Sequence, residues 1–427
     1  MKVQPYKVGP DFIDPSLHRL VCGRASRNLD TWLMPSNLIP ELFARNARKA
    51  DVALIEGVMG FYDGLGGSND EVSTAQMARI LHSPVVLVID AQGMARSAAA
   101  VVLGFKVLDS RINLAGVILN RVAGEKHAEM CREAIETSTG VPVLGAIPLD
   151  ESIKLPERHL GLIPAPEGAL SDTFLSNLAK ITADHVDLTR LIEVAKNCSE
   201  LPEPNAIPVD ESETRVKLGV AFDEAFNFYY QDALDYLEQQ GAEIKTFSPL
   251  HDQTLPAEIS GIYIGGGFPE MHAQGLEVNQ GMRRSILSLA EDGMPILAEC
   301  GGMMYLSQSL STSDQRRHRM VGVLPGDTEM TGRLTLNYTI ARTTDAHPFL
   351  KPDGEIRSHE FHYSKIVNLP RDAKYAYKLS LGQGIDQNLD GLVEYSTIGS
   401  YVHTHLVGCP SYAKAFVGAC HEHSAKS

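Results

Sequence analysis

Residues 294–306 read MPILAECGGMMYL, and this stretch decides the fold of the second half of the chain. Its apolar residues up to Ala298 predict a short buried strand, the glycines predict a sharp turn, and MMYLSQSL predicts the start of a helix. A cysteine at such a turn points out of the sheet, and the amides and dipole of the helix favour its thiolate. Cys300 is therefore a candidate nucleophile on a nucleophile elbow, and a buried structural cysteine is the alternative.

Two further features of the second half favour a nucleophile over a structural cysteine. Three glycines, residues 265–267, end the predicted strand GIYIGGG and leave backbone amides to face a ligand. His403 and His405 lie two apart on a predicted strand near the carboxyl terminus, so we expect their side chains to point the same way. A metal pair or a surface pair is the alternative, but a third metal ligand at suitable spacing is missing. A thiol, a histidine and free amides are the parts needed for acyl transfer, with an oxyanion hole expected at Gly266, Gly267 and Gly301.

Composition describes a globular protein whose main partners are neither nucleic acids nor membranes. The 427 residues suffice for two or three domains, 44% of them are hydrophobic and 21% are charged. A net charge of -15 argues against nucleic acid and anionic membranes as main partners. The six cysteines include no CxxC pair, so the sequence predicts neither a disulfide framework nor a zinc site, and we expect a reducing cytoplasm. No apolar run approaches the roughly 18 residues of a membrane span, and no signal-peptide pattern is present.

The first half alternates buried strands with helices, which is typical of a doubly wound, mostly parallel α/β sheet. The predicted strands are VALIEG, SPVVLVID, INLAGVILN and VPVLGAIPLD. Ligands of such sheets bind at the carboxyl ends of the strands, and four polar residues are expected there: Glu56, Asp63, Asp90 and Asn120. An acidic residue at the end of a buried strand is costly unless a cation meets it. In nucleotide-binding proteins that cation is usually Mg²⁺; a helix cap or a salt bridge is the alternative.

Three more aspartates belong to loops of the first half. Asp11 and Asp14 lie three apart in KVGPDFIDP, and Asp30 precedes a predicted helix that holds the only tryptophan, Trp32. A polar binding loop at the end of a strand is the functional interpretation, and a solvated turn is the alternative.

A linker divides the chain into two expected domains. The helical pattern of residues 171–196 gives way to NCSELPEPNAIPVDESETR, which is rich in Pro, Ser, Asn and acidic residues. We therefore expect a first domain at residues 1–197, a linker at 198–214 and a second domain at 215–427.

These motifs resemble a known family along nearly the whole chain. GGGFPEMHA, AECGGMMYL, SHEFHYS and SYVHTH resemble a class I glutamine amidotransferase domain of the subtype attached to cobyrinic acid amidases. KVGPDFIDP, SRNLDTWLM, LIEGVMGFYDG, GVILNRV and GAIPLDESIKLPERHLGL are similar to the synthetase domain of the same enzymes, which is related to dethiobiotin synthetase. The family is cobyrinic (or hydrogenobyrinic) acid a,c-diamide synthase, a group of ligases of cobalamin biosynthesis.

The resemblance implies a mechanism and a set of site residues. Glutamine would be hydrolysed at Cys300, and its ammonia would displace phosphate from carboxylates a and c of a tetrapyrrole that MgATP has activated. His403 would be the base, and His405 would stand where a glutamate completes the triad in relatives. Glu56 and Asp30 would face Mg²⁺ and Asn120 the adenine, while the phosphate and tetrapyrrole side would be lined by Asp11, Asp14 and Asp63. The expected partners are small-molecule substrates, and a homodimer is the assembly considered.

One departure from the family concerns the phosphates of ATP. Synthetase domains of this family begin with a strand and a GTxSxxGKT-type loop before KVGPDFIDP, and GxxxxGK[ST] occurs nowhere in this chain. Without those amides and that lysine, MgATP binding should be weak. We expect a start codon placed too late; a degenerate, non-ATP-using ligand-binding module is the alternative. Sirohaem or nickel sirohydrochlorin remains an alternative acceptor, and a free-standing glutamine hydrolase fits the first-half motifs poorly.

Overall fold

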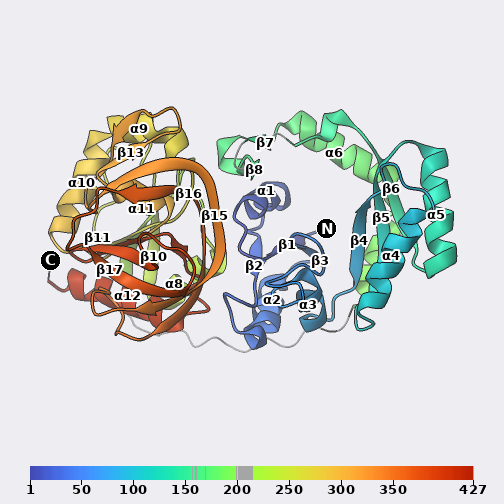
Figure 1. Cartoon of the computed structure of the whole chain (residues 1–427), viewed down its shortest axis with the longest axis horizontal. Coiled ribbons are helices and arrows are strands. Elements are labelled where there is room, and N and C mark those ends of the chain that lie inside the picture. Colours follow the sequence, from blue (N-terminus) through green and yellow to red (C-terminus); the bar gives the residue numbers. More distant parts are fainter. Residues whose placement is uncertain (156, 159–160, 169, 199, 201–214, 427) are drawn as a thin grey trace. The chain divides into compact units, whose positions relative to one another are not determined.

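The computed structural model describes residues 1–155, 157–158, 161–168, 170–198, 200 and 215–426 (Figure 1). The chain divides into two compact units: unit 1 holds residues 1–31 and 36–205, and unit 2 holds residues 32–35 and 206–427. Of the expected linker, residues 199 and 201–214 lie outside the described residues, as do residues 156, 159 and 160 of the LPERHLGL motif. Residues 32–35 were expected in the first domain, and the structure counts them with unit 2.

Unit 1 contains the parallel strands that the sequence predicts, arranged in two sheets. The first sheet has the order β2-β1-β3, from β1 (Val3–Val8), β2 (Arg27–Leu29) and β3 (Val52–Glu56). The second has the order β4-β5-β6, from β4 (Val85–Asp90), β5 (Leu114–Val122) and β6 (Val143–Pro148). Within the described part of the chain β3 pairs only with β1 and β4 only with β5, so no strand joins the two sheets.

Helices connect the strands of unit 1 and cover its second sheet. They are α1 (Ile13–Cys22), α2 (Ile39–Ala47), α3 (Thr74–Ile80), α4 (Ser97–Leu108), α5 (Glu125–Thr139), α6 (Asp172–His185) and α7 (Leu188–Lys196). Short 3-10 turns are η1 (Ser36–Leu38), η2 (Glu151–Ile153) and η3 (Ala165–Glu167), and β7 (Glu157–Arg158) pairs with β8 (Gly161–Leu162). The core of the second sheet joins Val102 of α4 and Ile135 of α5 to Val117 and Leu119 of β5, because these side chains are apolar and fully buried.

Unit 2 is built on a parallel sheet that continues into an antiparallel one. The parallel strands are β9 (Val216–Ala221), β10 (Ala242–Phe247), β11 (Ile259–Ile264) and β12 (Ile296–Glu299), with β19 (Thr397–Ser400) parallel to β12. The remaining strands are β13 (Ser309–Ser311), β14 (Arg317–Arg319), β15 (Asp327–Thr343), β16 (Glu355–Val367), β17 (Lys374–Leu381), β18 (Leu389–Glu394) and β20 (Val402–His403). The path runs β10-β9-β11-β12-β19-β18-β17-β15-β13-β14, and β16 pairs with β15 and β20.

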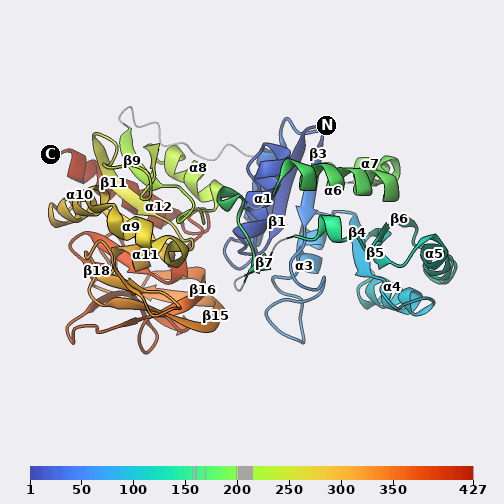
Figure 2. The ribbon, with the colours of Figure 1, turned by 90° about the horizontal axis from the view of Figure 1, so that it is seen from above.

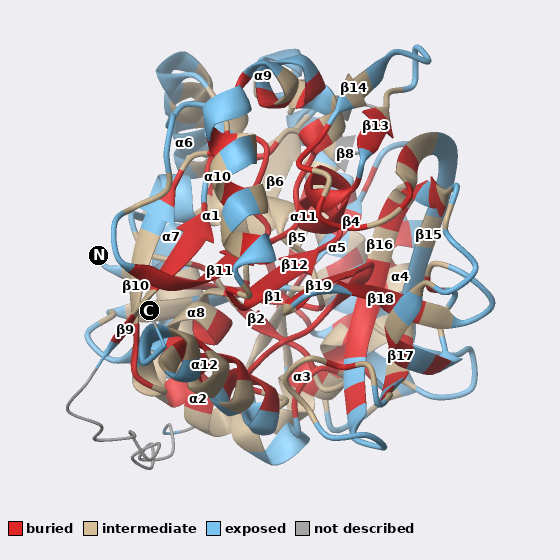
Figure 3. Ribbon diagram, turned by 90° about the vertical axis from the view of Figure 1, so that its left-hand side faces the viewer, coloured by how far each residue is buried: buried red, intermediate tan, exposed pale blue. Residues whose placement is uncertain are grey.

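Helices cover both faces of the parallel sheet of unit 2. They are α8 (Gln231–Gln239), α9 (Ala273–Val278), α10 (Gln280–Glu291), α11 (Gly301–Leu306) and α12 (Pro410–Ser424), with η4 (Pro269–His272) before α9. Helix α12 packs on β9 and β11 (Figure 2). Met282 and Ile286 of α10 share a core with Ile262 and Ile296 of the strands. Figure 3 shows β11 and β12 buried along their length, as expected for strands of largely apolar sequence inside a parallel sheet.

No helix among the described residues is long and apolar enough to cross a membrane.

Candidate active site

Cys300 lies at the turn between β12 and α11, as the sequence predicts. Its backbone has φ +48° and ψ −100°, a strained conformation for a residue with a side chain. A Cβ on Gly302 would collide with the carbonyl oxygen of Ile264 on β11, so the helix can start this close to the sheet only because that residue is glycine. The strand, turn and helix therefore form the predicted elbow.

Burial favours the protonated form of the Cys300 thiol and outweighs the stabilisation that a helix amide gives to the thiolate. The residue is only 6% exposed, and its Sγ donates a hydrogen bond to the carbonyl oxygen of Phe361, 3.4 Å away. Burial raises the pKa of the thiol far above its usual range, the charge of Glu270 raises it further, and a hydrogen bond from the Gly301 amide only partly offsets this. Helix α11 has six residues, so its dipole is weak. A base must therefore remove the proton when substrate is present.

The triple-glycine turn lies directly against the elbow. A Cβ on Gly301 would lie 3.0 Å from the backbone nitrogen of Gly267. The Gly265 amide donates to the hydroxyl of Tyr229 at 2.7 Å, so it is occupied within the fold. Gly265 is not one of the residues expected in the oxyanion hole, which are Gly266, Gly267 and Gly301, so its bond to Tyr229 leaves that expectation unchanged.

His403 lies at the same glycine turn. It ends β20, which pairs with β16 so that His403 stands opposite His359. The two imidazole rings stack with centroids 4.9 Å apart and 12° between their planes. A Cβ on Gly266 would lie 2.6 Å from Cε1 of His403, so this ring occupies the space that the missing side chain leaves.

His405 lies in a different environment from His403. The expectation that both share one strand is wrong, because β20 ends at His403 and His405 belongs to the turn that follows. Its ring packs against Tyr230, with centroids 4.7 Å apart. The Tyr230 hydroxyl and Nε2 of His359 are hydrogen-bonded at 2.6 Å. Burial lowers the pKa of His359 well below its usual value, and the charge of protonated His403 would lower it further.

Glu299 is a residue of this site that the sequence reasoning missed. It ends β12, directly before the nucleophile, and is 4% exposed. Its carboxylate accepts hydrogen bonds from the Tyr263 hydroxyl at 2.9 Å and from the Thr404 amide at 3.0 Å. Oε2 lies 3.7 Å from Nδ1 of His403. The sequence does contain a signal for Glu299, because it is an acidic residue at the end of a buried strand, as Glu56 is.

In unit 1, three of the predicted acidic residues converge on a lysine that the sequence reasoning did not single out. Nζ of Lys7, on β1, lies 2.5 Å from Oδ2 of Asp14, 3.4 Å from Oε1 of Glu56 and 3.6 Å from Oδ2 of Asp11. The other Glu56 oxygen is 2.6 Å from Nε2 of His18. The cation that meets the acid at the end of β3 is therefore an ammonium group in this structure.

The charges of this cluster are shared unevenly. Burial and the charge of Asp14 raise the pKa of Asp11 to about 6, although Lys7 opposes them. Burial disfavours the charge of Asp14, but its hydrogen bond to Lys7 prevails and lowers its pKa. Among the residues that the structure describes, no group of three or more His, Cys, Asp or Glu side chains is arranged to hold a metal ion.

The remaining predicted residues of unit 1 make local contacts. Asp63 accepts a hydrogen bond from a backbone amide of its own loop at 3.0 Å. Asn120 accepts one from the Arg121 amide at 3.0 Å, and the Arg121 guanidinium pairs with Asp90. Asp30 follows β2 and is buried. The structure thus brings Asp11, Asp14 and Glu56 together and gives Asp63 and Asn120 neighbours of their own.

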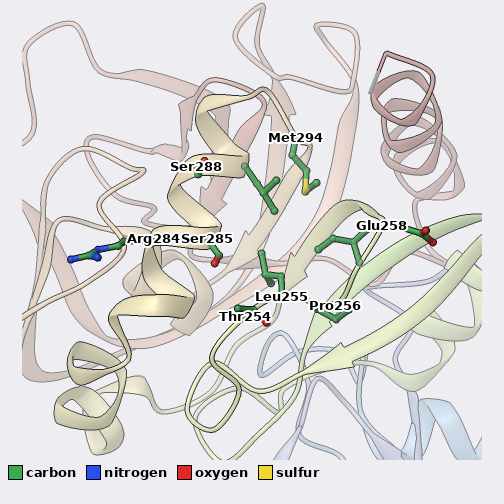
Figure 4. A pocket seen from close by; sticks show the side chains of 10 residues that line it. Thr254, Leu255, Pro256, Glu258, Arg284, Ser285, Ser288 and Met294 are labelled. Atoms are coloured by element: carbon green, nitrogen blue, oxygen red, sulfur yellow. The ribbon is translucent and has the colours of Figure 1, made fainter.

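A pocket of about 520 Å³ opens elsewhere on unit 2 (Figure 4). It adjoins the residues that precede β11 and β12, at the opposite end of these strands from Cys300. It is lined by Thr254, Leu255, Pro256, Glu258, Ile259, Arg284, Ser285, Ser288, Leu289 and Met294. None of the predicted site residues contributes to it.

Two family models match the chain, one for each half. The model described as CobQ/CobB/MinD/ParA nucleotide binding domain matches residues 1–163. The model described as CobB/CobQ-like glutamine amidotransferase domain matches residues 217–409.

Curated relatives match along nearly the full chain. A cobyrinate a,c-diamide synthase of Methanosarcina barkeri is 43% identical over 443 residues, which cover 98% of this chain and 90% of that protein. One of Archaeoglobus fulgidus is 44% identical over 421 residues, covering 97% of this chain and 90% of that protein. Among solved structures, PurLQS from Thermotoga maritima matches 49% of this chain and 99% of its own, with 18% identity and a TM-score of 0.38.

Proposed function

This chain belongs to the cobyrinate a,c-diamide synthase family, and from that premise we propose that it amidates carboxylates a and c of cobyrinate with glutamine as the nitrogen donor. The nucleotide-binding domain of unit 1 implies that ATP drives the reaction. The observation that carries the proposal is the placement of Cys300, His403 and the triple-glycine turn beside one another in unit 2.

The glutaminase step follows from that placement. His403 takes the proton from Sγ of Cys300, and the thiolate attacks the amide carbon of glutamine. The oxyanion forms against the amides of Gly266, Gly267 and Gly301, and each such donor contributes about 3 kcal/mol to the transition state. The carbon–nitrogen bond then breaks, and His403 returns the proton to the departing ammonia. Water hydrolyses the remaining thioester and releases glutamate.

Unit 1 would use ATP to convert a tetrapyrrole carboxylate to an acyl phosphate, from which ammonia displaces phosphate. We propose Asp11, Asp14 and Glu56 as residues of this half-reaction, because they gather at the carboxyl ends of β1 and β3. Mg²⁺ is proposed as the companion of ATP. The described carboxylates surround Lys7 and do not form a cage for a metal ion, so no step is assigned to the ion.

The acceptor, assembly and compartment are part of the proposal. The names of the curated relatives favour cobyrinate over sirohaem or nickel sirohydrochlorin, and competition among these tetrapyrroles would test the choice. We propose a reducing compartment, since all six cysteines are free. A homodimer is the proposed assembly, which sedimentation would check.

A Cys300→Ala variant tests the function. We expect it to lose glutamine hydrolysis and glutamine-dependent amidation of cobyrinate, while amidation supported by ammonium chloride persists. Cys420→Ala on α12 is the matched control, since it removes another buried thiol from the same unit. Glutamine hydrolysis that survives in Cys300→Ala would overturn the proposal.

A further inference from the structure

We propose that Glu299 is the positioning residue of His403, so that unit 2 carries a Cys300–His403–Glu299 triad whose acid directly precedes its nucleophile. This inference rests on the proposed glutaminase function and deepens it. It replaces His405 as the third member of the constellation.

The first argument is that Glu299 is fixed where His403 needs a charge. Oε2 lies 3.7 Å from Nδ1 of His403, and the two side chains are almost inaccessible to water. The Tyr263 hydroxyl, on β11, bonds to Oε2, and the Thr404 amide bonds to Oε1. Because Thr404 follows His403 directly, the carboxylate also fixes the backbone that carries the imidazole.

The second argument is that His405 occupies a different place. Its ring packs on Tyr230, and the residue between the two histidines turns its amide to Glu299. In a triad of this class the acid follows the base in sequence, at the position that His405 occupies here. We propose that Glu299, at the end of β12 and directly before Cys300, takes the place of that acid.

The third argument is energetic. The Cys300 thiol is buried and donates a hydrogen bond to the carbonyl oxygen of Phe361, and burial favours its protonated form, so proton transfer to His403 would create an imidazolium ion inside a buried site. An isolated buried charge is costly unless an opposite charge accompanies it. Glu299 is the anion that faces Nδ1 of His403, whereas the stacked ring of His359 supplies no negative charge.

The proton balance is simple. The Sγ proton moves to Nε2 of His403, and Nδ1–H remains directed toward the carboxylate of Glu299. Nε2 then gives the same proton to ammonia as the amide carbon–nitrogen bond breaks. Glu299 never contacts substrate, and it acts through the orientation and charge of His403.

The test compares Glu299→Gln with Tyr263→Phe. We expect Glu299→Gln to lower kcat/KM for glutamine hydrolysis by about 10²–10⁴-fold, because the carboxylate charge is lost in a similar volume. Tyr263→Phe removes one hydrogen bond to the same carboxylate and keeps the charge, so we expect a loss below about tenfold. Glu299→Asp should recover part of the activity that Glu299→Gln loses.

A pH profile separates positioning from structure. The groups that face His403 include Glu299 from β12, the His359 ring from β16 and, through Glu299, the Tyr263 hydroxyl from β11. Without the Glu299 anion the imidazolium is less stable, so the acid limb of kcat/KM should move to lower pH in Glu299→Gln and stay in place in Tyr263→Phe. Iodoacetamide should also alkylate Cys300 more slowly in Glu299→Gln than in Tyr263→Phe.

Two results would overturn the inference. One is a Glu299→Gln enzyme within threefold of wild type. The other is a loss of activity with an unmoved acid limb and a melting temperature lowered as in Tyr263→Phe, which assigns Glu299 a structural role. Cys300→Ala keeps the two proposals apart: if it still hydrolyses glutamine the proposed function fails, and if it is inactive while Glu299→Gln is active only the triad fails.

Discussion

At the scale of single residues, the surroundings of Cys300 favour the protonated thiol over the reactive thiolate. Cys300 is buried and its thiol donates a hydrogen bond to a backbone carbonyl oxygen, while its backbone has a strained positive φ that costs about 1–3 kcal/mol. The surrounding glycines and the strand pairing maintain this conformation. Reactivity therefore depends on neighbours that accept a proton and stabilise charge only when glutamine is bound.

The choice between the two histidines gives the first prediction. His403→Ala should lower glutamine hydrolysis by about 10²–10⁴-fold, because its ring lies at the glycine turn beside the elbow. His405→Ala should lower it far less, since that ring packs on Tyr230. Initial rates of glutamate release measure both, and circular dichroism checks that each variant folds. A loss confined to His405→Ala would reverse the assignment of the base.

The lysine of unit 1 gives the second prediction. Lys7→Met leaves Asp11, Asp14 and Glu56 without their shared cation, so the free energy of unfolding of unit 1 should fall by about 2–3 kcal/mol. This is below the loss at a fully buried pair because the Glu56 side chain is 48% exposed. Urea unfolding followed by circular dichroism measures it. Adding Asp11→Asn should restore part of the loss by reducing the repulsion, and an unchanged first variant would contradict the prediction.

Glu299 and Lys7 also show where prediction from the sequence stops at this scale. Cys300, its glycines and the acids of KVGPDFIDP could be found because each motif is local and has a recognisable pattern. The partners of Glu299 come from β11 and from the turn after β20, and those of Lys7 from α1 and β3. Contacts between segments so far apart depend on strand order, which a single sequence does not fix. For the same reason the dominance of burial over the helix at Cys300 was missed.

At the scale of elements, Asp390 connects β18, the strand that contains it, to β20, the strand that carries His403. It is fully buried on β18, and its two oxygens accept hydrogen bonds from the amides of Tyr401 and Val402, where β20 begins. Burial raises its pKa from 3.8 to about 6, although these hydrogen bonds oppose the shift. The position of His403 thus depends on a carboxyl group that titrates just below neutral pH.

A pH-dependent stability follows as the third prediction. Between pH 4 and 6 the folded chain holds a proton on Asp390 that the unfolded chain releases, so this group's contribution to stability falls as pH rises through that window. The loss should reach about 3 kcal/mol and stay constant at higher pH. Asp390→Asn removes this titration. The free energy of unfolding of wild type minus that of the variant should therefore fall as the pH rises from 4 to 7. Urea midpoints at four pH values measure it, and a difference independent of pH would contradict the prediction.

The strands of unit 1 illustrate prediction at the same scale. Parallel strands β3 to β6 were recognised because apolar runs end in polar residues at regular intervals. The separation of these strands into two sheets was not predicted, because an apolar run does not indicate which strand it pairs with. The consequence is visible at Leu54 on β3 and Val88 on β4, which are 64% and 60% exposed on strands that read as buried. Such apolar edge strands are sites at which sheets add further strands.

At the scale of the whole molecule, the chain divides into two compact units, and a proline-rich stretch that interrupts the strand–helix pattern led us to expect two domains. The sequence did not indicate that residues 32–35 belong to unit 2. Trp32 donates through Nε1 to the carbonyl oxygens of Thr339 at 3.3 Å and Ser358 at 3.2 Å, and the Arg357 guanidinium lies 4.9 Å from its ring. These partners are on β15 and β16, which come some three hundred residues later in the chain.

The sole tryptophan should therefore report on unit 2 even though it lies near the start of the chain. Loss of the contacts with β15 and β16 exposes the indole to water, so its emission should shift when unit 2 unfolds. Urea titrations of full-length variants distinguish the units: Asp390→Asn should move the fluorescence midpoint, whereas Lys7→Met should move only the part of the circular dichroism transition that belongs to unit 1. If Lys7→Met moved the fluorescence midpoint by as much as Asp390→Asn, Trp32 would depend on unit 1 for its environment. The assignment of residues 32–35 to unit 2 would then have no energetic meaning, because a segment belongs to a cooperative unit only if it unfolds with that unit.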